Sequence, residues 1–245
     1  FFQNLPEEAA RYGLNRKGAD TYSIRRYGAH GTSHQYVSGR VSEILGRDDL
    51  RQIVLHIGNG ASVSAVVNGS AVETSMGLTP LEGLVMGTRT GDIDPAVVFH
   101  LARTAGMDID ELDALFNRGS GLKGLTGQND MRAVRTLAAG GDENAIEALA
   151  VYAHRIVKYI GAYAAVMGGL DAITFTAGAG ENDADLRADV IGRLAGFGVR
   201  INADLNAARS KEPRILSTPD STVAVLVVPT NEELAIARQA MSLVE

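Results

Sequence analysis

Short apolar runs alternate with longer amphipathic ones along the chain, and this alternation predicts an α/β fold with interleaved strands and helices. Residues 53–57 form an apolar run typical of a buried strand. Residues 62–67 and 70–74 also have β character, and Asn68-Gly69 between them is a strong hairpin-turn signal. We therefore expect three successive strands joined by two turns.

Helical spacing dominates the middle of the chain. Residues 95–104 begin with a proline that suits the first turn of a helix, and residues 109–117 form a second helical stretch with acidic residues in its first turn. Residues 144–167 are apolar enough for a long, central and buried helix, which Gly168-Gly169 would end. Three helices are therefore expected after the third strand.

The last third of the chain twice places a strand directly before a helix. Residues 172–176 form a strand-like run that leads into a glycine loop at 177–182, and helical spacing follows over 184–194. Residues 222–228 are strongly β-branched and precede a helix over 232–243. Because no repeat and no long linker interrupts the chain, one main domain is the simplest interpretation.

The composition narrows the class of function. The 245 residues are 45% hydrophobic and 21% charged, which is ordinary for a globular protein. A net charge of −6 implies no strongly basic surface, so we expect neither nucleic acid nor a membrane as a partner. The chain has no cysteine and no apolar run near the ~20 residues that span a bilayer, so a cytoplasmic protein with a small or metal-associated ligand is expected.

Two glycine-rich segments follow predicted strands and could bind a ligand. Residues 177–182 lack the Lys-Ser/Thr ending of a P-loop and do not match Gly-x-Gly-x-x-Gly. Their backbone could still approach a flat or anionic ligand closely, or they could be a plain turn. Residues 56–60 could cradle a phosphate through backbone N–H groups and the Asn59 amide, or form an ordinary tight hairpin turn. Local sequence leaves both alternatives open.

One arginine has the surroundings of a group that binds an anion. Arg89 lies in a polar loop between Gly87 and Gly91, just before a predicted helix. A guanidinium presented in this way can hold phosphoryl or carboxylate oxygens in a bidentate manner. Alternatively, it pairs on the surface with Asp92 or Asp94.

Two histidines lie four residues apart near the start of the chain. On a helix, the spacing of His30 and His34 would suggest metal ligands. However, Gly28 and Gly31 flank His30 and indicate irregular backbone, with a helix that starts near His34. We therefore interpret His34 as structural, whereas His30 could donate a hydrogen bond to developing negative charge.

In their residues and in their order along the chain, these motifs together resemble the acetate kinase family over nearly the whole chain. The matching segments are residues 25–38, 56–62, 74–84, 86–95, 130–132, 175–182 and 229–233. The resemblance implies the C-terminal portion of such an enzyme, in the superfamily of sugar kinases, actin and heat-shock chaperones. It implies a ribonuclease-H-like (actin-like ATPase) domain over residues 1–232, with a mixed sheet flanked by helices, and a helix over 233–245 that packs on an N-terminal domain.

The resemblance also implies a reaction, the reversible transfer of the γ-phosphoryl group of ATP to acetate with Mg²⁺, giving acetyl phosphate and ADP. His30 and Arg89 would be the catalytic residues that stabilise charge on the transferring group. Glu232 would help to hold Mg²⁺, directly or through water. The nucleotide-binding residues would be His56, Ile57, Gly58, Asn59 and Gly60 at the phosphates, and Asp130, Met131, Arg132, Gly178, Ala179, Gly180, Glu181 and Asn182 around the adenosine.

The chain departs from the family at Ala29, where the family usually has Phe. In the family this position, together with the segment that carries Pro80, walls the acyl pocket. A smaller side chain should widen that pocket. We therefore expect acetate as the substrate and keep propionate, or another short carboxylate, as the alternative.

The second departure is that the family's N-terminal phosphate-binding turn, a further substrate arginine and an acidic residue have no counterpart in these 245 residues. The chain alone is expected to lack one wall of its active site. The resemblance implies a homodimer, for which residues 144–167 could form the face, although burial within one subunit explains them equally well. A non-catalytic nucleotide-binding or dimerisation fragment is the alternative to a kinase, and Arg89 and His30 count against a non-catalytic module.

Overall fold

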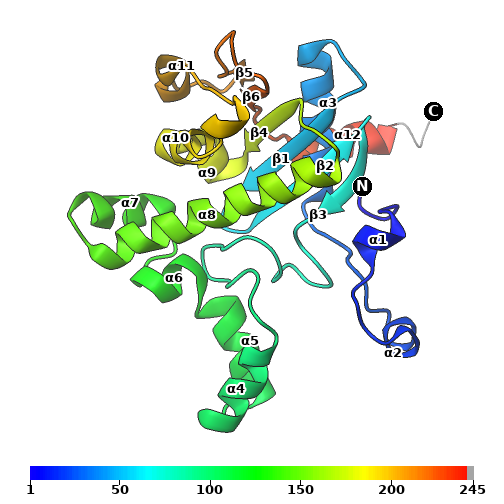
Figure 1. Cartoon of the computed structure of the whole chain (residues 1–245), viewed down its shortest axis with the longest axis vertical. Helices are drawn as coiled ribbons and strands as arrows, with labels where there is room; N and C mark the ends of the chain where they lie inside the picture. Colours follow the sequence, from blue (N-terminus) through cyan, green and yellow to red (C-terminus); the bar gives the residue numbers. More distant parts are fainter. Residues whose placement is uncertain (242–245) are drawn as a thin grey trace.

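A six-stranded mixed sheet forms the centre of the computed structural model, which describes residues 1–241 apart from the side chains of residues 232, 234, 235, 238 and 239 (Figure 1). The strands lie in the order β3-β2-β1-β4-β6-β5. Their bounds are β1 Arg51–Ile57, β2 Ala61–Val67, β3 Ser70–Thr74, β4 Ala172–Thr176, β5 Arg214–Ile215 and β6 Ala224–Val227. β1, β4 and β6 run parallel, whereas β2, β3 and β5 each pair antiparallel with their neighbours. The predicted mixed α/β architecture is thus confirmed.

Helices cover both faces of this sheet (Figure 1). Their bounds are α1 Glu7–Ala10, α2 Arg16–Thr21, α3 Gly31–Leu45, α4 Ala96–Thr104, α5 Ile109–Arg118, α6 Gly121–Thr126, α7 Met131–Ala139, α8 Glu143–Val166, α9 Ala177–Asn182, α10 Ala184–Gly192, the 3₁₀ turn η1 Ala195–Phe197, α11 Ala203–Ala207 and α12 Glu232–Met241. α8 crosses one face and contacts β1 and β2, whereas α3 contacts β1 and β4. The sheet is therefore the middle layer between α8 and α3.

Alternation along β1 decides which side chains meet which helix. Ile53, Leu55 and Ile57 belong to the large core that includes α8. Val54 belongs to a smaller core with buried residues of α3. Because successive side chains of a strand point to opposite faces, His56 shares the face of Val54 and is directed toward α3.

The bounds of most predicted strands and helices agree with the structure to within about two residues. Asn68 and Gly69 have φ values of 51° and 77°, which are the left-handed conformations that a two-residue hairpin turn needs. Gly168 and Gly169 also have positive φ and follow the end of α8, as predicted. β6 is shorter than the predicted strand over 222–228.

Three predictions about secondary structure are wrong: the glycine loop at residues 177–182, the complete burial of α8 and the start of α3 near His34. Residues 177–182 form the short helix α9 instead of a glycine loop, because the Glu181 carboxylate accepts a hydrogen bond from Ala177 N at 2.8 Å and closes the first turn. α8 is not buried all round, since Ile146 and Val166 are 51% and 61% exposed. Its buried residues recur at helical spacing, so α8 is an amphipathic helix on the sheet face.

The last described helix, α12, lies on the α3 side of the sheet. α12 contacts α3, and residues 242–243 of the predicted helix lie outside the described residues. The packing of residues 233–245 on a further domain stays a prediction. Within residues 1–241, no helix combines the length and apolar character that a membrane crossing requires.

Candidate active site

Two predicted ligand-binding segments, and the residues that lead to the predicted metal ligand Glu232, follow the carboxyl ends of the three parallel strands. Residues 58–60 follow β1, α9 follows β4, and residues 229–231 follow β6. Parallel strands end at the same edge of a sheet, which is where α/β proteins usually bind ligands. The segments contact one another there: Thr230 N donates to the Glu181 carboxylate at 3.3 Å.

His30 lies beside this edge and caps α3 in a left-handed conformation, with φ 60° and ψ 25°. This conformation is uncommon for residues other than glycine, which confirms the predicted irregular backbone. The helix nevertheless begins at Gly31 and not near His34. Gly28 is required before it, because it has φ 72° and a Cβ there would lie 2.7 Å from the Phe2 ring.

His34 is fully buried between two serines of β2. Its Nε2 lies 2.7 Å from Ser62 Oγ and its Nδ1 lies 2.7 Å from Ser64 Oγ. Burial, with a further contribution from His56 and His30, holds the pKa of His34 well below its usual value. Both ring nitrogens are therefore occupied in a neutral imidazole, in agreement with the structural interpretation of this residue.

His30 and His56 stack on each other, with ring centroids 4.0 Å apart and planes inclined by 17°. His30 Nδ1 lies 2.8 Å from Ser62 Oγ, and His56 Nδ1 lies 2.9 Å from Ser33 Oγ. Burial and then the charge on Arg89 lower the pKa of His30. Burial and then His30 lower the pKa of His56 to about 3. Both imidazoles are therefore neutral near pH 7.

Arg89 reaches the same place from the loop before α4. A Cβ built on Gly60 would lie 3.4 Å from Arg89 Nη1 and 3.6 Å from His30 Nε2, so both side chains converge on the bare backbone of the β1–β2 turn. Arg89 Nη1 also donates to Pro80 O at 3.3 Å. The structure thus brings together the two predicted catalytic residues.

The surface ion pair considered for Arg89 is not formed by the described residues. Asp92 instead accepts hydrogen bonds from Gly83 N and from the Tyr159 hydroxyl, both at 2.8 Å. Asp94 accepts from Ala96 N at 2.9 Å. The guanidinium of Arg89 is therefore left to face the site.

The start of α6 holds the Arg89 loop in place. Met86 N donates to Arg89 O at 3.1 Å, and Leu122 N donates to Met86 O at 2.9 Å. Gly121 has φ 63°, and a Cβ at this residue would lie only 2.2 Å from Met86 O. The position of the Arg89 loop therefore depends on this close backbone packing against the start of α6.

The two predicted pocket residues flank the histidine and arginine. Ala29 precedes His30, is half-buried and packs against the large core. Pro80 is exposed, and its carbonyl accepts the hydrogen bond from Arg89. Ala29 is thus next to His30 in the chain and Pro80 is bonded to Arg89, and their role as walls of an acyl pocket stays a prediction.

Asp130, Met131 and Arg132 lie at the start of α7. The Asp130 carboxylate accepts from Arg132 N at 2.8 Å and from Arg132 Nη2 at 2.6 Å. Hydrogen bonding from Arg132 lowers the pKa of Asp130 to about 2. Met131 is half-buried against the large core, whereas the two charged side chains are exposed. This segment therefore presents a surface ion pair.

Asn59 connects the β1–β2 turn to the neighbourhood of α7. Gly87 N donates to Asn59 O at 3.0 Å. A Cβ at Gly87 would lie 2.2 Å from Asn59 Oδ1 and 3.1 Å from Asn129 O. Gly87 thus lies between the phosphate-binding turn that we predicted and the residue before Asp130.

In α9, two of the predicted nucleotide-binding side chains are already bonded within the protein. Glu181 holds Ala177 N and Thr230 N, and Asn182 Nδ2 donates to Gly178 O at 2.9 Å. Gly180 packs against Ile57, at 3.6 Å from an added Cβ to the Ile57 Cβ, whereas space around Gly178 is open within 4 Å. Open backbone at Gly178 is therefore what α9 offers a ligand.

Sequence reasoning missed a buried arginine beneath α9. Arg187 donates to Gly180 O at 2.9 Å, to Asn206 Oδ1 at 2.7 Å and to Asn206 O at 2.8 Å. Burial, with a further contribution from Arg214, lowers the pKa of Arg187 to about 10. In the sequence it is one of several arginines in a helical stretch, so no local signal distinguishes it.

Ser62 and Ser64 were missed as well, although a signal was present. They are two residues apart in an otherwise apolar strand and so point to one face, the face that meets α3. Ser33 and Thr230 complete the set, with Thr230 Oγ1 2.9 Å from Ser33 Oγ.

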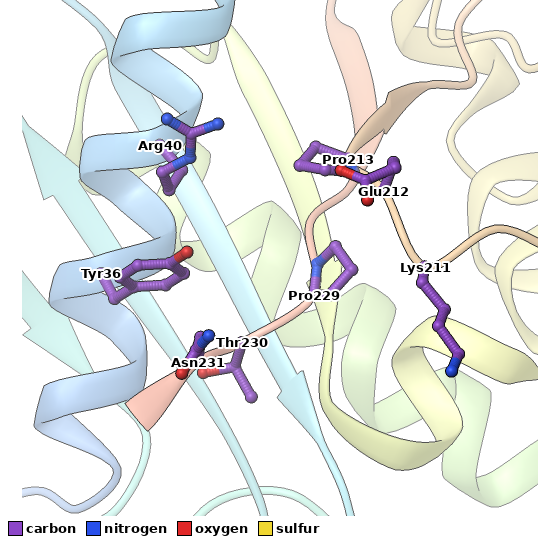
Figure 2. A pocket seen from close by; sticks show the side chains of 8 residues that line it. All are labelled: Tyr36, Arg40, Lys211, Glu212, Pro213, Pro229, Thr230 and Asn231. Atoms are coloured by element: carbon purple, nitrogen blue, oxygen red, sulfur yellow. The ribbon is translucent and has the colours of Figure 1, made fainter. Parts of the chain in front are cut away.

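A cavity of about 370 Å³ opens beside residues 229–231. Figure 2 shows Arg40 of α3 and Lys211 on opposite sides of Pro229. The lining residues are Tyr36, Arg40, Lys211, Glu212, Pro213, Pro229, Thr230 and Asn231. Thr230 thus lines this cavity and also bonds to Ser33, the partner of His56. Neither of the predicted catalytic residues lines the cavity.

The predicted metal ligand Glu232 is the first residue of α12, and its side chain lies outside the described residues. Among the residues whose side chains are described, no group of three or more His, Asp or Glu could hold a metal ion by itself. A Mg²⁺ ion that one protein carboxylate and the nucleotide phosphates share needs no such group.

Known proteins match nearly the whole chain. The family model described as "Acetokinase family" matches residues 1–238. An acetate kinase of Leifsonia xyli subsp. xyli is 60% identical over 246 aligned residues, which cover 100% of this chain and 62% of the relative. An acetate kinase of Streptomyces griseus subsp. griseus is 58% identical and is covered to 60%. The chain thus spans about three fifths of the length of these relatives.

Solved structures are similar over the same share. The crystal structure of an acetate kinase from Porphyromonas gingivalis has a TM-score of 0.97 at 43% identity, with 100% of this chain and 62% of that chain covered. A propionate kinase from Francisella tularensis has a TM-score of 0.92 at 42% identity, with 97% and 61% covered. The actin-like ATPase fold implied by the sequence is confirmed.

Proposed function

The chain belongs to the acetokinase family, and from this premise we propose that the protein transfers the γ-phosphoryl group of ATP reversibly to acetate. The observation that carries the proposal is the convergence of His30 and Arg89 on the backbone of Gly60. A neutral imidazole donor and a guanidinium beside exposed glycine backbone suit a trigonal phosphoryl group whose charge is spread over three oxygens.

In the proposed reaction, a carboxylate oxygen of acetate forms a bond to the γ-phosphorus. The bond from that phosphorus to the β–γ bridging oxygen breaks, and its electron pair leaves with ADP. No proton has to move, because the carboxylate is already ionised. The work of the protein is therefore to align two anions and to donate hydrogen bonds to the transferring group, from His30 Nε2 and Arg89.

The nucleotide lies, in this proposal, along the edge where the parallel strands end. The turn at residues 56–60 contacts the phosphates, and residues 130–132 and 178–182 surround the adenosine. The bond from Gly87 to Asn59 and the open backbone at Gly178 support this placement. Glu232 would hold Mg²⁺, directly or through water, and the ion would supply positive charge that offsets the charge of the phosphates.

One assay tests the reaction. Acyl phosphate is trapped as the hydroxamate after incubation with Mg²⁺-ATP and acetate, propionate or butyrate. The full natural polypeptide is assayed, together with this chain wherever the two differ, since the chain spans 62% of the length of the Leifsonia xyli relative. We expect acetyl phosphate from the natural polypeptide. Lack of acyl phosphate from both proteins would overturn the proposal.

Propionate is the second candidate substrate, and Ala29 is the observation that favours it. The family usually has a phenylalanine there, and a propionate kinase is among the similar structures. Ala29→Phe should lower the efficiency with propionate relative to acetate by about tenfold, the value of roughly one well-packed methylene. An unchanged ratio would rule out Ala29 as the cause of any propionate use.

We further propose a cytoplasmic homodimer, as the family resemblance implies. Exposed apolar side chains on α8, such as Ile146 and Val166, support α8 as part of the contact surface. Light scattering across a range of concentrations measures the mass. A monomer at every concentration would contradict the dimer.

A further inference from the structure

A chain of four polar side chains runs from the interior of the sheet to the proposed phosphoryl site. It begins at Ser64 Oγ, passes through His34 Nδ1 and Nε2, continues to Ser62 Oγ and ends at His30 Nδ1. The successive distances are 2.7, 2.7 and 2.8 Å. Each group can share one proton with the next, so the chain has a direction that fixes where the protons lie.

The buried end selects that direction. Ser64 is completely buried, and His34 Nδ1 is the hydrogen-bond partner of its hydroxyl among the described residues. If His34 Nδ1 carried the proton, the hydroxyl hydrogen of Ser64 would have no acceptor and would be buried at a cost of ~1–3 kcal/mol. The Ser64 hydroxyl therefore donates to His34 Nδ1, and His34 Nε2–H donates to Ser62.

The position of the proton on His30 follows from the single hydrogen of the Ser62 hydroxyl. Ser62 Oγ accepts from His34 and has a single hydrogen, which is then directed to His30 Nδ1. A neutral imidazole that accepts at Nδ1 carries its proton at Nε2. His30 Nε2 is the atom that lies 3.6 Å from a Cβ built on Gly60, on the side where Arg89 lies.

A second, shorter series of hydrogen bonds fixes the tautomer of His56, the ring that stacks on His30. Thr230 Oγ1 lies 2.9 Å from Ser33 Oγ, and Ser33 Oγ lies 2.9 Å from His56 Nδ1. With Thr230 as the donor, Ser33 donates to His56 Nδ1, and His56 also carries its proton at Nε2. Both rings of the stack then present an N–H group toward the turn at residues 58–60.

We propose that Ser64, His34 and Ser62 are positioning residues that hold His30 as the Nε2–H tautomer, so that a neutral histidine donates to the phosphoryl group instead of facing it with a lone pair. The proposal deepens the proposed function, on which its catalytic consequence rests. A neutral imidazole donates from one ring nitrogen only, whereas an imidazolium donates from both. Here burial and then the charge on Arg89 disfavour an imidazolium at His30, so the tautomer decides which ring nitrogen donates.

Nitrogen-15 NMR of the histidine side chains tests the tautomer without any substrate, because protonated and bare ring nitrogens have widely separated shifts. The natural polypeptide, labelled at its histidines, is measured at pH 7.5, and His30→Asn assigns the signal. We expect a protonated Nε2 and a bare Nδ1 for His30. The reverse pattern for His30 in the unmutated protein would overturn the proposal.

Variants extend the test to the positioning residues. Ser62→Ala and Ser64→Ala should both shift His30 toward a mixture of tautomers and lower kcat by roughly tenfold, with KM values near those of the unmutated protein. Thr174→Val is the matched control: Thr174 is equally buried, its hydroxyl has no partner among the described residues, and the change should leave the His30 shifts unaltered.

The two readouts separate two kinds of failure. The expected tautomer in a protein that makes no acyl phosphate would overturn the proposed function and leave the tautomer assignment intact. A Ser64→Ala protein that folds, as judged by its amide spectrum, and keeps the His30 shifts would overturn the role of the buried end.

Discussion

The two ends of the proposed site are stabilised in different ways. The histidine end, defined as His30, His34, His56, Ser62 and Ser64, is mostly buried, neutral and bonded between α3, β1 and β2. The nucleotide end, defined as residues 130–132 and 177–182, includes charged and exposed groups that bond largely to residues within four positions in the chain.

This difference indicates which chemistry each end can perform. Side chains that are fixed by partners far away in the sequence keep their geometry when a ligand binds, as stabilisation of a transferring phosphoryl group requires. Exposed local pairs can exchange their partners for a ligand at low cost. We therefore expect substitutions at the histidine end to reduce kcat, and those at the nucleotide end to act on nucleotide affinity.

The largest expected effect comes from Arg89, which lies beside the histidine end because it converges with His30 on Gly60. Arg89→Ala removes a charged donor beside the γ-phosphoryl group and should lower kcat by roughly 10²–10³-fold. Arg132→Ala is the counterpart at the nucleotide end, where an exposed arginine pairs with Asp130, and should change kcat by less than about threefold. The hydroxamate assay measures both. Equal losses would remove the distinction between the two ends.

The next effect is on stability, at the buried base of the nucleotide end. Arg187→Leu leaves Gly180 O and two oxygens of Asn206 without their donor and should reduce the free energy of unfolding by roughly 3 kcal/mol. Arg193→Leu, at the end of the same helix, removes only a partly exposed pair with Asp189 and should stay within ~0.5 kcal/mol. Urea unfolding measures both. A stable Arg187→Leu protein would show that α9 needs no anchor.

The histidine end should lose stability in acid. The pKa of His56 is about 3 in the folded protein, below the value of ~6.5 of a free histidine, so the unfolded chain takes up the proton first as the pH falls. The contribution of neutral His56 to the free energy of unfolding is complete above about pH 6.5 and decreases toward pH 3. At pH 5 it is about 2 kcal/mol smaller than at pH 7.

His56→Asn, which keeps a polar group near the Nδ1 position, should therefore lose about 2 kcal/mol less than the unmutated protein between pH 7 and pH 5. His100→Asn, at an exposed position of α4, is the control and should leave the loss unchanged. Urea titrations at the two pH values give the difference. Identical losses in all three proteins would contradict a buried neutral His56.

The smallest effect compares two glycines. Gly60→Ala would place a methyl group between Arg89 and His30, with contacts of 3.4 and 3.6 Å that the fold can accept. It should weaken ATP binding by about tenfold, or ~1.4 kcal/mol, because the backbone can no longer approach the phosphates. Gly178→Ala points into open space and should weaken binding less. Calorimetric titration with Mg²⁺-ATP ranks them, and the reverse order would exchange their proposed roles.

Much of the fold followed from local sequence. Apolar periodicity located β1, β4 and α8, and the left-handed glycines at residues 69 and 168 marked a hairpin and a helix end because few other residues adopt that conformation. The motifs around His30 and Arg89 also identified the two groups that the structure brings together. The short helix α9 was not predicted, because the bond that closes its first turn, from Ala177 N to the Glu181 carboxylate, is a side-chain contact that helix propensity does not report.

By itself, then, the sequence determined the alternation of the main strands and helices, the family and the residues that converge on Gly60. Only the tertiary structure decided which partners those residues have: that Ser62 lies between His30 and His34, that Arg187 holds α9, and that Arg89 is free of the nearby aspartates. The physical reason is distance along the chain. Turns and helix ends depend on neighbours a few residues away, whereas the protons of a buried hydrogen-bond chain are placed by groups that meet only after the sheet has formed.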